Sequence, residues 1–260
     1  MSKTAYERVQ AARSSSRPTG EDYINNVFAG FIEMHGDRGF ADDPSVTAGI
    51  AMLGNTPFTV IATEKGHDTK NRLRRNFGTP NPEGYRKALR LMMQAEKFLR
   101  PVVCFVDTSG AFCGIGAEER GQGHAIAACI TGMLALRTPV LSILVGEGGS
   151  GGALALACAN EVWMLEGATY SVISPEGCAN ILWREPERAA EAAEALKLTA
   201  YDVMSLGVVE RIIPETGRDP DRLYSALSLE IAKWYSAAKA LQPDELVQRR
   251  YERFRKMGSL

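Results

Sequence analysis

The segment that most constrains the fold of this chain is residues 140–156, VLSILVGEGGSGGALAL. Its first six residues are an apolar run with the length of a buried strand. Five glycines then fall within residues 146–152, and the apolar residues 153–156 begin a helix. A buried strand that leads through a glycine turn into a helix predicts an α/β protein with a mainly parallel sheet covered on both faces.

The same turn indicates chemistry on a negatively charged group. Glycine has no Cβ, so a substrate can approach the backbone closely. The first N–H groups of a helix have no acceptor within the helix and carry partial positive charge. We therefore expect an anion, or a carbonyl oxygen that develops negative charge, for which one donor contributes roughly 2.7–4 kcal/mol in the transition state. The alternative is a tight turn for strand–helix packing alone, but five glycines in seven residues exceed that need.

Two phosphate-binding motifs compete with this interpretation. A P-loop requires Lys followed by Ser or Thr after its last glycine, and two apolar residues stand there instead. The dinucleotide fingerprint matches formally as Gly146-x-Gly148-x-x-Gly151, with Glu166 about 20 residues further on. However, so many glycines match several patterns by chance, and this strand lies in the middle of the chain instead of opening a nucleotide-binding unit.

A nucleophile elbow also matches formally, with Ser150 at its centre. Its catalytic triad needs a histidine later in the chain, and all three histidines precede Ser150. No Cys/His pair stands out either. The sequence therefore indicates catalysis by oriented backbone dipoles, with the reactive chemistry brought by a substrate or cofactor.

Two further loops are candidates for ligand contact. Residues 107–116 follow another apolar strand, and adjacent glycine loops at strand ends form a crevice in such sheets. Its candidate ligand-binding residues are Gly110, Ala111 and Gly114. Residues 65–75 are basic and suit phosphates or carboxylates, although a solvated charged face is the alternative. The candidates there are Lys65, Arg74 and Arg75.

The remaining elements follow from hydrophobic periodicity and turn residues. Apolar spacing predicts a helix from Tyr23 to about His35, and an amphipathic helix over 83–99 that buries Ala88, Leu91, Met92, Ala95 and Phe98. The other predicted elements are a hairpin of 46–53 and 57–63, a strand at 101–108, a helix at 124–136, two extended segments within 161–176, a helix at 187–197, helix–turn–strand over 199–215 and helices over 221–256 broken at Pro243.

Composition bounds the remaining possibilities. The 260 residues carry a formal net charge of −1, which gives no argument for nucleic acid or membrane binding. No apolar run approaches the roughly 20 residues of a membrane span, and the N-terminus lacks the apolar core of a signal peptide. Five cysteines without zinc-site spacing suggest reduced packing residues and no metal. We expect a cytoplasmic protein with a flexible arm at 1–20 and a single domain at 21–260 that ends in a helical segment.

Five stretches of the sequence resemble one known family along most of the chain, from about residue 20 to 256. They are HGDRGFADDPSV, KGHDTKNRLRRNFGTPNPEGYRKALRLM, DTSGAFCGIGAEERGQ, GEGGSGGALAL and YSVISPEGCANILW. They closely resemble the α subunit of bacterial acetyl-CoA carboxylase carboxyltransferase, a member of the crotonase-like superfamily. Motifs of this length and order are highly specific.

The resemblance implies a crotonase-like ββα-superhelix, the ClpP/crotonase fold. It implies transfer of a carboxyl group from carboxybiotin, held on a biotin carboxyl carrier protein, to acetyl-CoA, which yields malonyl-CoA for fatty-acid synthesis. It also implies an α2β2 complex that works with biotin carboxylase. In that complex a zinc-ribbon β subunit makes most of the acyl-CoA contact, and this chain supplies the biotin side without a metal.

The family's oxyanion residues fall on Gly151 and Gly152, whose amides would hold charge on the ureido oxygen of biotin. Gly148 and Gly149 join the 110–114 loop as expected cofactor contacts. This chain departs from the family pattern Asp-Thr-Pro-Gly-Ala-Tyr-Pro-Gly, because Ser109, Phe112 and Cys113 replace both prolines and the tyrosine. Loop rigidity and a hydroxyl are therefore in question.

Three alternatives remain open at this stage. A crotonase-type hydratase would need a carboxylate near the turn, for which Glu166 or Glu176 would have to serve. A subunit of a biotin-dependent acyl-CoA decarboxylase would share the same turn. A non-catalytic scaffold subunit is disfavoured because the glycines are intact.

Overall fold

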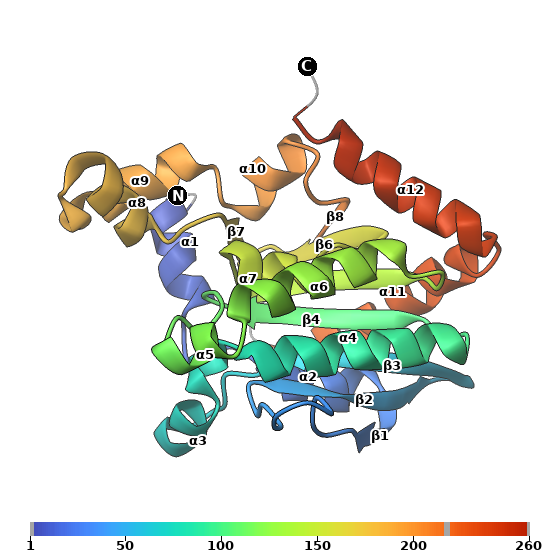
Figure 1. Ribbon diagram of the computed structural model, residues 1–260. Helices are drawn as coiled ribbons and strands as arrows, with labels where there is room; N and C mark the ends of the chain where they lie inside the picture. Colours follow the sequence, from blue (N-terminus) through green and yellow to red (C-terminus); the bar gives the residue numbers. More distant parts are fainter. Residues whose placement is uncertain (1–2, 216–218, 259–260) are drawn as a thin grey trace.

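A mixed β-sheet forms the centre of the structure, a computed structural model that describes residues 3–215 and 219–258 (Figure 1). Its strands run in the order β1-β2-β3-β4-β5-β6-β8, and β7 pairs with the end of β5. The strands are β1 (Ala29–Glu33), β2 (Val46–Leu53), β3 (Thr56–Thr63), β4 (Val102–Thr108), β5 (Val140–Gly149), β6 (Glu161–Leu165), β7 (Thr169–Ser171) and β8 (Arg211–Ile213).

The pairing of these strands confirms the predicted mainly parallel sheet. β2 and β3 form the expected antiparallel hairpin, in a register that joins Leu53 to Thr56 across the turn. From β3 through β4, β5 and β6 to β8, neighbouring strands run parallel. Every residue of β4 is buried. Parallel strands covered on both faces carry continuous apolar runs, which is why the sequence pattern is legible here.

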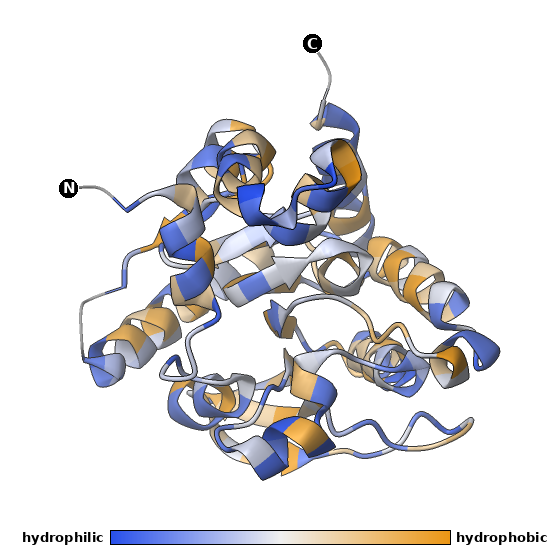
Figure 2. Ribbon diagram, turned by 90° about the vertical axis from the view of Figure 1, so that its left-hand side faces the viewer, coloured by the Kyte–Doolittle hydropathy of each residue, from blue (hydrophilic) through white to orange (hydrophobic). Residues whose placement is uncertain are grey.

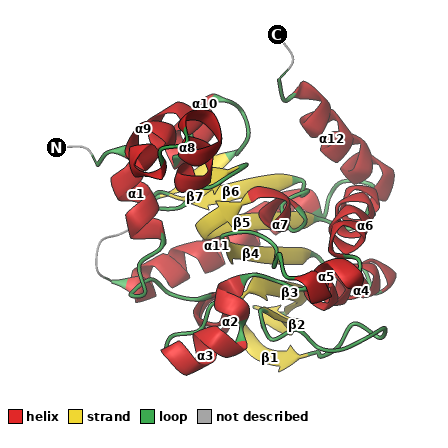
Figure 3. Ribbon diagram, turned by 60° about the vertical axis from the view of Figure 1, so that its left-hand side comes forward, coloured by secondary structure: helices red, strands yellow, loops and turns green. Residues whose placement is uncertain are grey.

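Helices cover both faces of the sheet (Figures 1 and 3). α4 and α6 pack together on one face, while α2 and α11 pack together on the other. The helices are α1 (Ala5–Ala12), α2 (Gly20–Val27), α3 (Thr69–Arg74), α4 (Pro82–Lys97), α5 (Ile115–Glu119), α6 (Gln122–Ala135), α7 (Ser150–Leu154), α8 (Pro175–Trp183), α9 (Ala189–Leu196), α10 (Ala200–Ser205), α11 (Pro220–Ala238) and α12 (Pro243–Lys256), with 3-10 turns at Asn76–Gly78 and Pro186–Arg188.

The long helices are amphipathic, and Figure 2 shows bands of hydrophobic and hydrophilic residues along them. On α4 the predicted face is confirmed at Ala88, Leu91, Met92 and Ala95, all of which are buried. Phe98 was expected with them, but its side chain is 58% exposed. The reason is that α4 ends at Lys97, so Phe98 leaves the helical spacing that would have carried it into the core.

The helix predicted from Tyr23 to about His35 is wrong in its second half. α2 ends at Val27, and Phe28 already has an extended backbone with φ −117° and ψ 163°. The next five residues form the edge strand β1, which pairs antiparallel with β2. Backbone pairing with the hairpin thus overrides an apolar spacing that also fitted a helix.

The N-terminal residues are more ordered than the loose arm expected from their polarity. Thr4 caps α1 with a capping box, and Ala5, Val9 and Ala12 are buried, the first two in a small cluster with α9. α8 was not predicted, because Pro175 and Glu176 were assigned to an extended segment. Pro175 instead occupies the first turn of α8, where its missing N–H costs nothing. The residues around α1, α8, α9 and α10 gather beside the end of the sheet where β7 lies (Figure 1).

Candidate functional site

The glycine turn begins its helix earlier than predicted. β5 continues to Gly149, and α7 starts at Ser150 instead of residue 153. Gly151 and Gly152 therefore lie in the first helical turn, where backbone amides have no acceptor within the helix. Ser150 has φ 53°, the left-handed conformation that non-glycine residues rarely adopt. Such strain is commonly retained at functional sites.

Four of the five glycines in this turn are explained by packing. A Cβ on Gly146, Gly148, Gly149 or Gly152 would come within 3.0 Å of a neighbouring group. Those groups are, in the same order, the Asp107 carboxylate, the Tyr170 ring, the Ser109 carbonyl and the Ala111 amide nitrogen. Gly151 differs, because the nearest atom to its Cβ position is Ile126 Cγ2 at 3.7 Å, an ordinary contact. No contact with the residues that the structure describes requires a glycine there.

The structure brings the two glycine loops into contact, as the strand order predicts. The Cβ position of Gly152 lies 2.5 Å from the Ala111 nitrogen and 2.7 Å from the Gly110 carbonyl carbon. Gly110 itself has φ 145°, and its open space allows this approach. Gly114 lies further along the loop as the N-cap of α5, against the ring of Phe112.

The 109–114 loop is held without the two prolines of the family pattern. The Gln122 side-chain amide donates to the Pro80 and Phe112 carbonyls, each at 2.8 Å. The Phe112 amide donates to the Pro80 carbonyl at 3.0 Å, and the Thr108 hydroxyl donates to the Gly110 carbonyl at 2.8 Å. These bonds replace part of the rigidity that proline would give.

A network of four charges anchors the turn from the side of β4. The Asp107 carboxylate accepts the Glu147 amide at 2.8 Å and pairs with Lys65 Nζ at 2.6 Å. Lys65 also reaches Glu147 Oε2 at 3.1 Å, and Arg13 Nε reaches Glu147 Oε1 at 2.8 Å. Arg13 continues to Glu176 on α8, at 2.7 Å. The network therefore ties the turn to β4 and, through Arg13, to α8.

The pKa values in this network favour the charged forms. Burial lowers the pKa of Lys65, but the Asp107 and Glu147 carboxylates outweigh it and raise that pKa above its usual value. Burial raises the pKa of Glu147, but Lys65 and Arg13 outweigh it and hold that pKa below its usual value. The charged forms of Lys65 and Glu147 are therefore favoured, so the network acts as a fixed clamp and not as a proton donor.

The basic segment 65–75 does not gather into one anion site. Lys65 belongs to the network above. Arg75 is buried and donates to Glu21 at 2.6 Å and to the Pro44 carbonyl at 2.9 Å. Arg74 is exposed at the end of α3. The structure thus commits two of the three predicted side chains to contacts within the protein.

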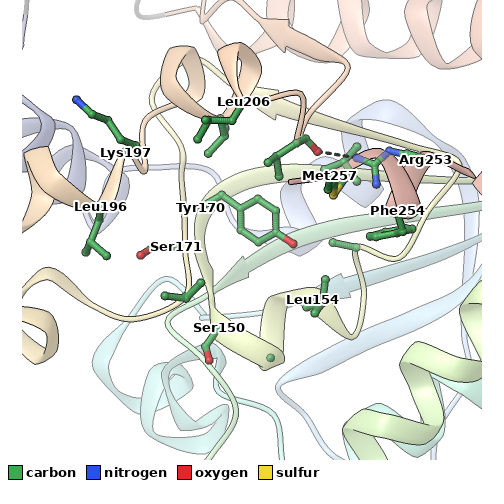
Figure 4. A pocket seen from close by; sticks show the side chains of 16 residues that line it. Ser150, Leu154, Tyr170, Ser171, Leu196, Lys197, Leu206, Arg253, Phe254 and Met257 are labelled. Carbon is green, nitrogen blue, oxygen red and sulfur yellow. Dashed lines mark hydrogen bonds between the residues drawn. The ribbon is translucent and has the colours of Figure 1, made fainter. Parts of the chain in front are cut away.

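An apolar pocket of about 690 Å³ opens at the turn (Figure 4). Leu154 and Tyr170 form its wall beside the turn, and Phe254 and Met257 close it from α12 and the residue after it. Arg253 lies at its side and donates to the Val208 carbonyl at 2.6 Å. The other lining residues are Ser150, Gly151, Ala157, Val162, Ser171, Val172, Leu196, Lys197, Val203, Leu206 and Val208.

Sequence reasoning missed the pocket and the network partners of Glu147. Arg13 and Glu147 are 134 residues apart, and no local motif joins them. The pocket combines α7, β7, α10 and α12, which also come from distant parts of the chain. The available signal was weak: an acidic residue inside a glycine turn needs a partner when the turn is buried.

Of the five cysteines, Cys113 is exposed and the other four are buried. Within residues 3–215 and 219–258, no cluster of three or more His, Cys, Asp and Glu side chains is arranged to hold a metal ion. In the same part of the chain, no helix combines the length and apolarity needed to cross a bilayer.

Sequence comparisons with known proteins point to one family. The family model described as acetyl co-enzyme A carboxylase carboxyltransferase-like matches residues 2–258. The acetyl-coenzyme A carboxylase carboxyl transferase subunit alpha of Ruminiclostridium cellulolyticum is 60% identical over 257 residues, which are 99% of each chain. A protein of Natranaerobius thermophilus named for subunits beta/alpha is 51% identical over 98% of this chain, which covers 43% of that protein.

Solved structures support the fold. A transcarboxylase 12S structure superposes with a TM-score of 0.71 at 18% identity, over 87% of this chain and 43% of the other. The beta subunit of Pseudomonas aeruginosa geranyl-CoA carboxylase gives a TM-score of 0.67 at 15% identity, over 93% of this chain and 46% of the other. This chain thus spans less than half of these structures, and it has their crotonase-like fold. The family match over nearly the whole sequence shows that the chain belongs to the acetyl-CoA carboxylase carboxyltransferase family.

Proposed function

We propose that this chain is the α subunit of an acetyl-CoA carboxylase carboxyltransferase. It takes part in moving a carboxyl group from carboxybiotin to acetyl-CoA, which gives malonyl-CoA for fatty-acid synthesis in the cytoplasm. The observation that carries the proposal is Gly151, because no contact with the described residues requires a glycine there and because it lines the pocket from the first turn of α7. A ligand that approaches these amides supplies the missing reason.

The pocket and turn fit a biotin group. The biotin ring and its aliphatic tether are apolar except at the ureido edge, and about 690 Å³ lies within the usual range for ligand pockets. The ring would lie against Leu154 and Tyr170, with the ureido edge at the turn. When bound, carboxybiotin supplies the carboxyl group and a ureido oxygen that gains negative charge as the carboxyl group leaves.

The chain's own contribution is electrostatic. The amides of Gly151 and Gly152 donate toward the position where that charge develops, and fixed donors of this kind need no reorganisation during the reaction. The Asp107 carboxylate holds the strand end through the Glu147 amide, so the donors stay aligned. No side-chain base is needed on this chain, which agrees with the absence of a triad in its sequence.

The acetyl-CoA side belongs to another chain in this proposal. The Natranaerobius relative joins beta and alpha subunits in one protein, and this chain corresponds to less than half of it. We therefore place a zinc-ribbon β subunit across the pocket mouth in an α2β2 complex, which is served by the biotin carboxyl carrier protein and biotin carboxylase. The expected contacts of Gly110, Ala111, Gly114, Gly148 and Gly149 with the cofactor remain part of this proposal.

A crotonase-type hydratase is less well supported. The Glu176 carboxylate is paired with Arg13, and that hydrogen bond holds its pKa below the usual value. Glu166 accepts a hydrogen bond from the Tyr201 hydroxyl at 2.9 Å. Neither carboxylate lines the pocket at the turn. None of the described residues that line the pocket is a carboxylate, so the pocket offers no carboxylate as general acid or base for hydration.

The test is reconstitution with the β subunit from the same genome. The complex is supplied with malonyl-CoA and biocytin, and transfer is followed as acetyl-CoA release that depends on biocytin. We expect biocytin to be carboxylated in equal amount. If malonyl-CoA is consumed equally fast without biocytin, no carboxyl group is transferred to biotin and the proposal is refuted. If no active complex forms, the carboxyltransferase assignment fails.

A further inference from the structure

Tyr85 carries a buried hydroxyl that the fold does not use. Its side chain is 0% exposed on α4, and its hydroxyl has no hydrogen-bond partner among the described residues. An unpaired buried hydroxyl is destabilising, whereas phenylalanine would fill the same space without that cost. A native protein that retains such a group invites a functional explanation.

The hydroxyl lies directly beneath the junction of the two glycine loops. The Cβ position of Gly152 is 2.8 Å from the Tyr85 oxygen and 2.5 Å from the Ala111 nitrogen. Because Gly152 has no side chain, the phenol can stand against the backbone at this point. Burial raises the pKa of Tyr85, so the group is a neutral phenol that can both donate and accept a hydrogen bond.

We propose that Tyr85 is a positioning residue for the oxyanion turn. When a ligand occupies the site, its hydroxyl hydrogen-bonds the backbone where the two loops meet and fixes the amides of Gly151 and Gly152 toward the developing charge. The hydroxyl acts through the backbone of the two loops and does not touch the substrate itself. This inference rests on the proposed function, because it assigns the support of the same turn.

The experiment compares Tyr85→Phe with Tyr23→Phe in the complete complex with the β subunit. Tyr23 is a matched control, since its hydroxyl is also buried and unpartnered, but its ring stacks on Phe105 beneath the other face of the sheet. Neither change removes a hydrogen bond present in the structure, so both variants should assemble and melt at or above the wild-type temperature.

For Tyr85→Phe we expect kcat to fall about tenfold, the rate equivalent of one neutral hydrogen bond, with an unchanged KM for malonyl-CoA. Tyr23→Phe should keep the wild-type kcat. A kcat for Tyr85→Phe within twofold of wild type, or an equal loss in both variants, overturns the role of Tyr85 while the carboxyltransferase assignment stands. An inactive wild-type complex refutes the proposed function, and with it this role.

Discussion

Replacing Gly151 by valine tests the turn without disturbing the fold. The Gly151 backbone is outside the positive-φ region, and its Cβ position meets only Ile126 at 3.7 Å. Replacing a glycine whose backbone conformation suits other residues stabilises the folded protein by about 0.4–1 kcal/mol, because the unfolded chain loses conformational freedom. The β-branched side chain of valine offsets part of this gain. We therefore expect the unfolding free energy to stay within about 1 kcal/mol of wild type.

Turnover should respond very differently. The two methyl groups of valine would occupy the space through which a ligand reaches the first-turn amides. Loss of a single oxyanion donor costs about 10²–10³ in kcat, equivalent to roughly 2.7–4 kcal/mol. Blocking the approach removes at least that much, so transfer from malonyl-CoA to biocytin should fall by a factor of about 10² or more, while the complex with the β subunit still assembles.

Gly123→Val is the matched control. Gly123 is the second residue of α6 as Gly151 is of α7, and apart from its own helix turn no described residue comes within 4 Å of its Cβ position. This variant should keep the wild-type kcat. Gly152→Ala is a poor test by comparison, because its methyl group would collide with the Ala111 backbone and shift the loop. Near-normal turnover of Gly151→Val in an assembled complex would show that the oxyanion assignment is wrong.

Three further predictions concern stability and reactivity. Arg250 is fully buried and donates to the carbonyls at the end of α6. Arg250→Met should therefore lower the unfolding free energy measured in urea by about 3 kcal/mol. A decrease of less than about 1 kcal/mol would contradict this prediction. Burial raises the pKa of Asp42, but hydrogen bonds led by Lys87 outweigh it and hold that pKa at about 2, below the 3.8 of the unfolded chain. The ionised Asp42 therefore contributes about 1 kcal/mol to the unfolding free energy after solvent screening, and this contribution is present above pH 3.8 and lost as pH falls toward 2. The unfolding free energies of the wild type and Asp42→Asn in urea should differ at pH 5 and converge at pH 2. Cys113 alone among the five thiols should react rapidly with a maleimide under native conditions, since the other four are buried and burial raises the pKa of Cys104 to about 12; a second fast thiol would contradict the burial pattern.

The parts of the fold that sequence reasoning predicted are those in which one local signal dominates. β4 and β5 are continuous apolar runs, and Gly54 at the hairpin has φ 58°, as a tight turn requires. The errors lie where two signals compete. Residues 29–33 fitted a helix by spacing, and their pairing with β2 is visible only in three dimensions.

The candidate site could also be predicted from the sequence only in part. Backbone groups of the turn could be predicted, because glycine content and strand–helix order are local properties of the sequence. The charges that hold the turn could not, because Arg13, Lys65, Asp107 and Glu147 come from four segments that meet only after folding. The departures at Ser109 and Cys113 suggested a looser loop, but the compensating hydrogen bonds come from Gln122 at the start of α6.

The structure gives a packing reason for four of the five glycines in this turn, residue by residue. At Gly146 a side chain would displace the Asp107 carboxylate, which holds the Glu147 amide and pairs with Lys65. At Gly152 it would separate the two loops. These glycines would be needed in a protein that bound nothing. Gly151 has no such constraint, so a substitution there separates the two explanations: packing alone predicts an unaffected enzyme, and an oxyanion site predicts an assembled but inactive one.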